Sequence, residues 1–179
     1  VICLNPAIDK IYRISDFAAG EDYPGQKPEM RVGGKGVNVA RVLSQLGAPV
    51  HLYGFLGEGG DIIRKEMKER CVCSFFDVSG ACRTTVNIID PKSGRETVIT
   101  EAGPQGSESD VRELMLELSD RVQPGDIVAA SGSIIAGAPA DIYAQISRIC
   151  GEIGAKCALD CNTSALKSSL SGDVRYILG

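Results

Sequence analysis

Residues 33–40 read GGKGVNVA, a glycine-rich turn that runs directly into a helical pattern. Apolar residues recur at three- and four-residue spacing before Gly47 ends the pattern, at Val39, Val42, Leu43 and Leu46. Glycines before a helix let the backbone approach a ligand, and the first helical N–H groups lack intrahelical partners. Lys35 adds a charge and Asn38 adds a donor and an acceptor, so the turn can hold hydroxyl groups or an anion. The alternative is a tight turn whose glycines serve only the backbone geometry.

Two well-known phosphate-binding motifs do not fit this turn. The dinucleotide fingerprint needs a third glycine where this chain has Val39. A P-loop needs Ser or Thr after its lysine, and Lys35 is followed by Gly36. The turn is therefore built for close approach, but not to a dinucleotide.

The composition excludes several classes of function. The 179 residues carry a net charge of −4 with a pI near 5.1, which gives no electrostatic footprint for nucleic acid. Tryptophan is absent and only 5% of the residues are aromatic, so base-stacking platforms are not expected either. No apolar run approaches membrane-span length, and the chain opens without a signal-peptide pattern. We therefore expect a cytoplasmic protein without nucleic-acid or membrane partners.

The seven cysteines and the single histidine form no metal-binding motif. No Cys-x-x-Cys pair occurs, and several cysteines lie in apolar strand-like runs, where a thiol packs as a small hydrophobic group. His51 falls in a predicted strand, and we expect it to pack rather than to act as a base. A Cys–His nucleophilic pair is the alternative, and no feature of the sequence supports it.

Strands alternate with helices along most of the chain. The predicted strands are 1–4, 50–55, 72–78, 126–130, 155–159 and 174–178. Five helices are predicted: one directly after the glycine turn, one over 61–69, one after a capping box at 107–110, one that begins at Pro139 and one over 163–170. This alternation predicts an α/β fold with a doubly wound parallel sheet covered by helices on both faces.

A second group of strands does not fit the alternation. The segment 7–14 alternates apolar and polar residues, and two β-branched runs, 84–90 and 96–100, flank a turn. We expect them to form a small sheet apart from the main one. Asp9 stands just beyond the carboxyl end of the first strand, where open α/β sheets bind ligands. The alternative for Asp9 is a carboxylate that caps a turn.

These motifs together resemble the ribokinase-like sugar kinases of the PfkB group, most closely the 1-phosphofructokinase and tagatose-6-phosphate kinase branch. Residues 4–9, LNPAID, resemble the opening motif of that branch, and residues 33–41 resemble its amino-terminal signature. The turn Ser131-Gly132-Ser133 and the pair Leu159-Asp160 are similar to later motifs of the family. The matches follow one another in the family's order over nearly the whole chain.

The resemblance implies a kinase that uses ATP and Mg²⁺ to phosphorylate a ketohexose phosphate, such as fructose or tagatose phosphate, to the bisphosphate. It also implies a Rossmann-like core and a small β-sheet lid, near 8–14, 26–32 and 83–101, that often forms a homodimer contact. Carried over by position, the residues beside the sugar would be Asp9, Gly33, Gly34, Lys35 and Asn38. Arg83 and Ser133 would bind the phosphate of the substrate.

One part of the family pattern is missing from these residues. The family's carboxy-terminal half carries Gly-Ala-Gly-Asp, whose aspartate is the general base, and no such run occurs here. The Asn-x-x-Glu magnesium motif would begin near 177–179. We therefore expect residues 1–179 to form a partial ribokinase-like domain that is inactive alone and leaves a strand edge exposed to self-association. Two alternatives remain: an inactive module that binds a sugar phosphate, and a superfamily kinase for an unphosphorylated sugar or a nucleoside.

Overall fold

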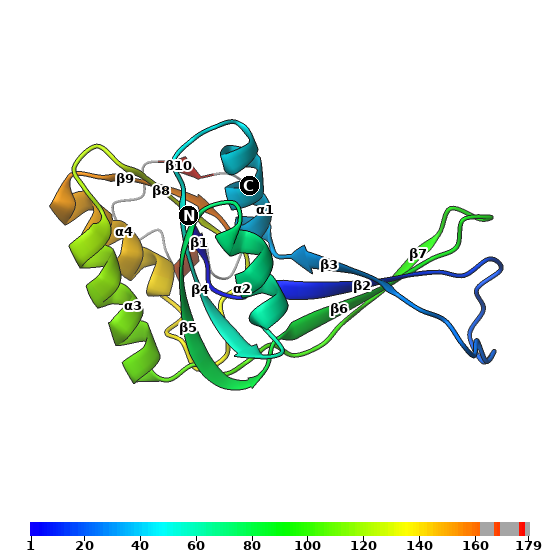
Figure 1. Cartoon of the computed structure of the whole chain (residues 1–179). Helices are drawn as coiled ribbons and strands as arrows, with labels where there is room; N and C mark the ends of the chain where they lie inside the picture. The colour runs from blue at the N-terminus through cyan, green and yellow to red at the C-terminus, as the bar shows by residue number, and fades with distance from the viewer. Residues whose placement is uncertain (162–166, 169–175, 178–179) are drawn as a thin grey trace.

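The computed structural model describes residues 1–161, 167–168 and 176–177. Within these residues the main sheet has six parallel strands in the order β10-β9-β8-β1-β4-β5 (Figure 1). The strands are β1 (Ile2–Cys3), β4 (His51–Glu58), β5 (Val72–Ala81), β8 (Ile127–Ser131), β9 (Lys156–Asp160) and β10 (Tyr176–Ile177). The predicted helix over 163–170 lies mostly outside the described residues.

Helices cover both faces of the main sheet. They are α1 (Lys35–Gln45), α2 (Asp61–Lys68), α3 (Glu108–Arg121) and α4 (Ile142–Ile153). One hydrophobic core joins α1 and α2 to the sheet through Val37, Ala40, Ile63 and Met67. The core on the opposite face contains Leu114 and Leu118 of α3 and Ile142 and Ile146 of α4. The predicted doubly wound α/β architecture is confirmed, because apolar helix faces lie on both sides of one parallel sheet.

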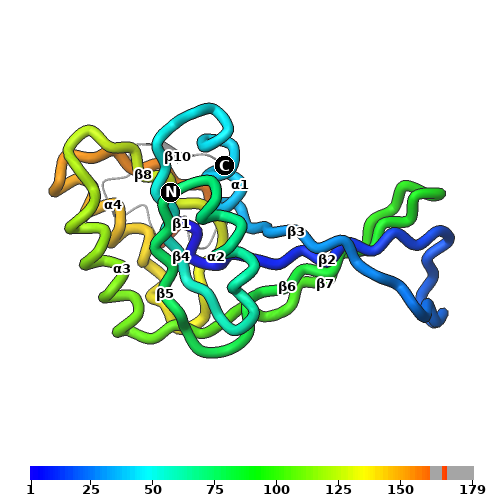
Figure 2. Tube along the Cα trace, viewed as in Figure 1, coloured from blue at the N-terminus to red at the C-terminus, as the bar shows by residue number. Residues whose placement is uncertain are grey.

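A small four-stranded sheet projects from this body (Figures 1 and 2). Its order is β3-β2-β6-β7, with β2 (Ala7–Arg13), β3 (Glu29–Gly33), β6 (Arg83–Ile89) and β7 (Glu96–Thr100). The central pair, β2 and β6, is parallel, and both outer pairs are antiparallel. The β-branched hairpin and the strand after residue 7 therefore form the separate sheet that their pattern predicted. The strand expected near 26–32 is β3, which begins at Glu29.

The apolar pattern predicted helix α1 but not the face that it buries. Val42 is 52% exposed and Leu46 is 76% exposed, whereas the buried positions are Gly36, Val37 and Ala40. A Cβ at Gly36 would lie 2.6 Å from the Cys3 Cβ and 2.8 Å from the Ile2 carbonyl oxygen. Glycine thus lets α1 lie directly on β1, which turns the glycine side of the helix inward.

The other helix ends differ in how well the sequence located them. Ser107 and Asp110 form the predicted capping box of α3, with the Ser107 hydroxyl accepting from the Asp110 N–H and the Asp110 carboxylate accepting from the Ser107 N–H. Helix α4 begins at Ile142 and not at Pro139. The Ile142 N–H donates to the Pro139 carbonyl, so Pro139 belongs to the turn before the helix.

The strand order places a topological switch point next to β1. From β1 the chain builds β4 and β5 on one side of the sheet and then returns to place β8, β9 and β10 on the other. Open α/β sheets bind ligands outside the carboxyl ends of the strands at such a point. Asn5 follows β1 there and Ser133 follows β8, and the small sheet leaves the body nearby through Ala7 and Arg83.

Candidate substrate-binding site

The glycine turn lies against the chain segment that leaves β1. Asp9 of β2 packs its carboxylate on Gly33, where a Cβ would overlap the carboxylate atoms. Gly34 has a φ of 107°, and a Cβ there would lie 3.1 Å from Pro6 Cα and 3.2 Å from Cys3 Sγ. Glycine at Gly33 lets the Asp9 carboxylate pack against the turn, and glycine at Gly34 permits the positive φ. Asp9 therefore lies in contact with the glycine turn.

Three side chains meet at the other end of the site, around the Ser133 hydroxyl. Asn5 Nδ2 and Arg83 Nη1 each donate to Ser133 Oγ, at 3.2 Å. Arg83 Nε and Asn5 Oδ1 are buried and have no hydrogen-bond partner among the described residues. Because Ser133 Oγ already accepts twice, its own proton is free to donate to an acceptor outside the trio. The trio thus offers a guanidinium and a hydroxyl proton, which suits an anion.

Asn5 is the member of this trio that the sequence analysis missed as a binding residue. It lies directly after the predicted strand 1–4. Its partner Ser133 lies 128 residues further along the chain, so no local pattern connects the two. Gly103 closes the other side, since a Cβ there would lie 2.6 Å from Asn5 Oδ1.

Lys35 lies between the glycine turn and the strand ends of β8 and β9. Its Nζ donates to Asp160 Oδ1 at 2.9 Å, and the Ser131 hydroxyl donates to Asp160 Oδ2 at 3.0 Å. The hydrogen bond from Lys35 holds the pKa of Asp160 below its ordinary value, and the Ser131 hydrogen bond acts in the same direction. Gly132 is adjacent, with the Lys35 Cβ 3.7 Å from the position of its missing Cβ. Lys35 therefore faces the site as one half of an ion pair and not as an isolated charge.

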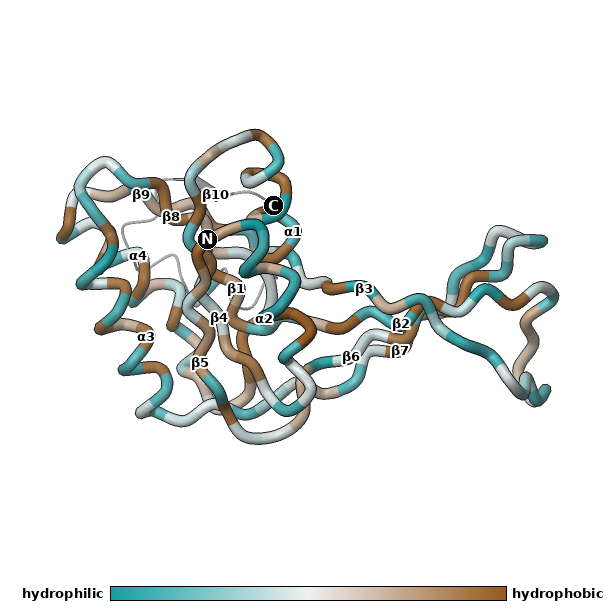
Figure 3. The backbone as a smooth tube through the Cα atoms, viewed as in Figure 1, coloured by the Kyte–Doolittle hydropathy of each residue, from teal (hydrophilic) through white to brown (hydrophobic). Residues whose placement is uncertain are grey.

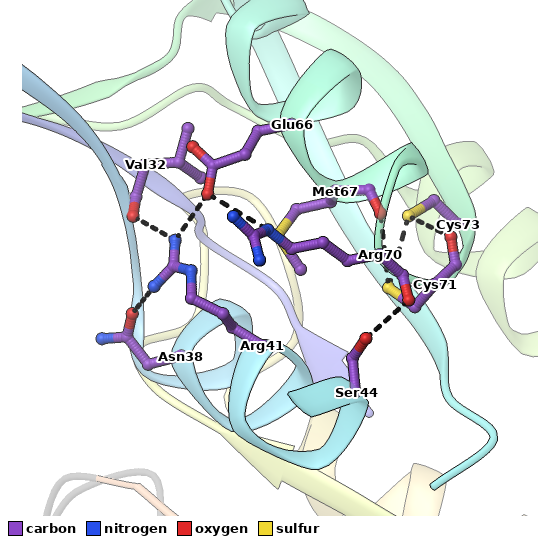
Figure 4. Close-up of polar contacts among 9 residues, drawn as sticks. All are labelled: Val32, Asn38, Arg41, Ser44, Glu66, Met67, Arg70, Cys71 and Cys73. Carbon is purple, nitrogen blue, oxygen red and sulfur yellow. Dashed lines mark hydrogen bonds and ion pairs between the residues drawn. The ribbon is translucent and has the colours of Figure 1, made fainter. Parts of the chain in front are cut away.

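Asn38 completes the predicted set on the first turn of α1. Its side chain is exposed, and its Oδ1 accepts from Arg41 Nη1 at 2.6 Å (Figure 4). The structure thus gathers the predicted residues in two groups at one edge of the sheet. One group contains Asp9, Gly33, Gly34, Lys35 and Asn38, and the other contains Arg83 and Ser133.

Other chemically interesting residues lie away from this site. His51 begins β4 and so lies at the amino end of the sheet, where its ring stacks on Tyr53 and Nε2 hydrogen bonds to the Ser74 hydroxyl at 2.8 Å. A cavity of about 320 Å³ is lined by residues 56–61 together with Asp77 and Val78, none of which belongs to the predicted set. The described part of the chain contains no cluster of three or more His, Cys, Asp or Glu side chains arranged to hold a metal. Nor does any helix in that part have the length and apolar character needed to cross a membrane.

Comparison with known proteins identifies the family of this chain. The profile of the pfkB family carbohydrate kinases matches residues 2–176. A structure described as a possible 1-phosphofructokinase from Thermotoga maritima is 31% identical, covers 96% of this chain and superposes with a TM-score of 0.84.

Phosphofructokinase-2 from Escherichia coli has the same fold. Its complex with fructose-6-phosphate is 21% identical, covers 98% of this chain and superposes with a TM-score of 0.88. Its tetrameric inhibited form is 20% identical over 98% of this chain, with a TM-score of 0.87. This chain spans 56% to 59% of the length of these three structures. With a family match over almost its whole length, the chain belongs to the pfkB family of carbohydrate kinases, as its motifs predicted.

Proposed function

We propose that this chain supplies the sugar-phosphate-binding part of a kinase that converts a ketohexose phosphate, fructose or tagatose phosphate, to the bisphosphate. The single observation that carries the proposal is the trio of Asn5, Arg83 and Ser133. It offers a buried, unpaired guanidinium N–H and a free hydroxyl proton at the sheet's switch point. A phosphate group satisfies both donors, whereas a neutral sugar hydroxyl leaves the guanidinium charge uncompensated.

The sugar end of the ligand is assigned to Asp9 and the glycine turn. A carboxylate accepts hydrogen bonds from two hydroxyl groups, and the missing side chain at Gly33 lets the Asp9 carboxylate lie directly on the glycine turn. The small sheet, which carries both Asp9 and Arg83, acts in this proposal as the lid over the substrate.

ATP supplies the transferred phosphoryl group in this family, usually with a divalent metal. The described residues do not fit a complete site for either: they hold no cluster of three metal-ligating side chains, and the sequence has no Gly-Ala-Gly-Asp run. The role proposed for these residues is to bind and orient the sugar phosphate. The inactivity of the chain alone and its cytoplasmic location stay predictions.

The small sheet also supports the predicted homodimer. Figure 3 shows hydrophobic residues along the strands of the projecting sheet, and Met30, Val98 and Ile99 are among the exposed large apolar residues. Val98 and Ile99 point to opposite faces, because side chains alternate along a strand. If two copies pack through one face, Lys at only one of these positions will convert the dimer to monomer in sedimentation equilibrium. Neither variant having any effect would contradict the lid-mediated dimer.

Calorimetric titration of the purified chain tests the substrate class. We expect binding of fructose 1-phosphate, fructose 6-phosphate or tagatose 6-phosphate, with much weaker binding of fructose, ribose and adenosine. Arg83→Met should abolish the preference for phosphorylated ligands. Arg148→Met, which removes the same charge from an exposed position on α4, should leave the preference intact. Binding of ribose or adenosine without any hexose phosphate would favour a superfamily kinase for those ligands instead.

A second assay separates the enzyme from the binding module. Purified chain that binds hexose phosphate is incubated with ATP and Mg²⁺, and bisphosphate formation is followed. Tight binding without turnover favours the inactive sugar-phosphate-binding module for this molecule.

A further inference from the structure

A group of side chains beside the glycine turn has no part in the function proposed so far. Arg41, on the second turn of α1, points its guanidinium at the junction of α1, α2 and β3 (Figure 4). Its Nη2 donates to the Val32 carbonyl oxygen at 2.7 Å and to Glu66 Oε1 at 3.1 Å. Its Nη1 donates to Asn38 Oδ1 at 2.6 Å. The side chain is only 23% exposed, so these bonds are partly shielded from water.

The contact with Asn38 fixes which way that amide faces. A guanidinium has five N–H donors and no acceptor, so the Asn38 atom that meets Arg41 has to be the oxygen. The Nδ2 group is then turned away from Arg41, as Figure 4 shows, and no described side chain accepts from it. Asn38 is therefore presented to a ligand as a donor of two hydrogen bonds.

The contact with Val32 acts on the glycine turn itself. The Val32 carbonyl and the Gly33 N–H belong to one planar peptide unit, so a bond to the carbonyl also fixes the direction of that N–H. Glu66 of α2 in turn holds Arg41, and Arg70 Nε lies 3.7 Å from the same Glu66 oxygen. The Ser44 hydroxyl adds a second link, from α1 to the segment that follows α2, by donating to the Arg70 carbonyl at 2.7 Å.

We infer that Arg41 is a positioning residue for the substrate site. It orients the Asn38 amide so that Nδ2 donates to the sugar, and Glu66 anchors it in that position. The inference rests on the proposed function, because it takes Asn38 as a sugar contact. Arg41 itself touches no ligand in this account and acts only through the residues that it holds.

A double-mutant cycle tests the inference, with the affinity for fructose 6-phosphate measured by calorimetry on the whole chain. Asn38→Ala should weaken binding by about 2- to 12-fold, the range for one ordinary hydrogen bond. Arg41→Met should weaken it by a similar factor in the wild-type background and by less in the Asn38→Ala background, since no amide remains to be oriented. An equal factor in both backgrounds would mean that Arg41 is merely structural and would overturn the inference.

The matched control is Arg70→Met. It removes a guanidinium from the same Glu66 carboxylate but breaks no bond to Asn38 or Val32. It should leave affinity within about twofold of wild type while removing the same charge. A loss equal to that of Arg41→Met would also overturn the inference, because it would trace the effect to the helix pair alone.

A spectroscopic readout distinguishes orientation from stability. The side-chain NH₂ resonances of Asn38, assigned by their loss in Asn38→Ala, should shift on addition of fructose 6-phosphate in the wild type and in Arg70→Met. In Arg41→Met they should shift far less at equal saturation. If the wild-type chain binds no hexose phosphate at all, the proposed function fails; if it binds and these resonances stay still, only the role of Arg41 and Asn38 fails.

Discussion

Alanine substitutions at Gly33 and at Gly36, two glycines of the same turn, should affect different properties: the first ligand binding and the second stability. At Gly33 the added methyl group would overlap the carboxylate of Asp9, which is the free end of a side chain and can rotate away. Gly33 has no positive φ, so alanine adopts its backbone conformation without strain. We therefore expect Gly33→Ala to change the free energy of unfolding by no more than about 1 kcal/mol.

Ligand binding should respond far more strongly to Gly33→Ala. The displaced Asp9 carboxylate no longer accepts from the sugar hydroxyls, and a hydrogen bond to a charged group contributes about 1.5–3 kcal/mol. At 1.4 kcal/mol for each factor of ten, the dissociation constant of fructose 6-phosphate should rise by about 12- to 150-fold.

Gly36→Ala should do the reverse and act on stability. Its methyl group would lie 2.6 Å from the Cys3 Cβ and 2.8 Å from the Ile2 carbonyl oxygen, atoms of a buried strand that cannot rotate away. Alanine in place of glycine favours a helix by about 1 kcal/mol. Overpacking a core costs about 1–3 kcal/mol and at times more. Because the Ile2 carbonyl belongs to the backbone of a buried strand, the steric cost should lie in the upper part of that range, at about 2–3 kcal/mol, which leaves a net loss of unfolding free energy of about 1–2 kcal/mol.

Urea unfolding and calorimetric titration of the same three proteins check both effects. The reasoning is refuted if Gly33→Ala binds fructose 6-phosphate as tightly as the wild type. It is also refuted if Gly36→Ala is as stable as the wild type.

Three further predictions concern a helix cap, the tip of the small sheet and the ion pair at the site. Ser107→Ala removes the capping box of α3 and should lower the urea midpoint by the equivalent of about 1 kcal/mol; an unchanged midpoint would contradict it. Hydrogen bonds, first from the Ser93 hydroxyl, lower the pKa of Asp90 from 3.8 to about 2, so its stabilising effect is full above pH 3.8 and lost as the pH falls towards 2. Amide resonances of the turn at 91–94 should report this transition, and its persistence in Asp90→Asn would contradict the assignment. Lys35→Met should raise the pKa of Asp160 in a ¹³C titration, and an unchanged value would mean that the ion pair is absent in solution.

The sequence predicted those parts of the fold that local patterns determine. The β-branched runs of the hairpin, the capping box at Ser107 and the strand–helix alternation each depend on residues close together in the chain. They were sufficient for the doubly wound sheet and for the separate small sheet. The family motifs then located the glycine turn and the Ser131–Ser133 turn at the same edge of the main sheet.

The remaining features depend on contacts between distant segments. Val42 and Leu46 looked like a buried helix face, but the close approach at Gly36 turns them to solvent. The spacing of apolar residues within the helix cannot predict which face is buried, because it carries no information about the strand on which the helix packs. For the same reason the sequence did not single out Asn5 or Arg41. Asn5 donates to Ser133, which lies 128 residues further along the chain, and Arg41 donates to Glu66, which lies 25 residues further along.

The most direct test of the central claim is an NMR titration of the ¹⁵N-labelled chain with fructose 6-phosphate. The account predicts that the largest shift changes fall on the amides of Gly33 and Gly34 and on the side-chain resonances of Asn38 and Arg83, while those of α3 stay in place. Saturable changes confined to another surface, such as the cavity lined by residues 56–61, would contradict the claim that the sugar phosphate lies across the strand ends between the glycine turn and the Arg83–Ser133 pair.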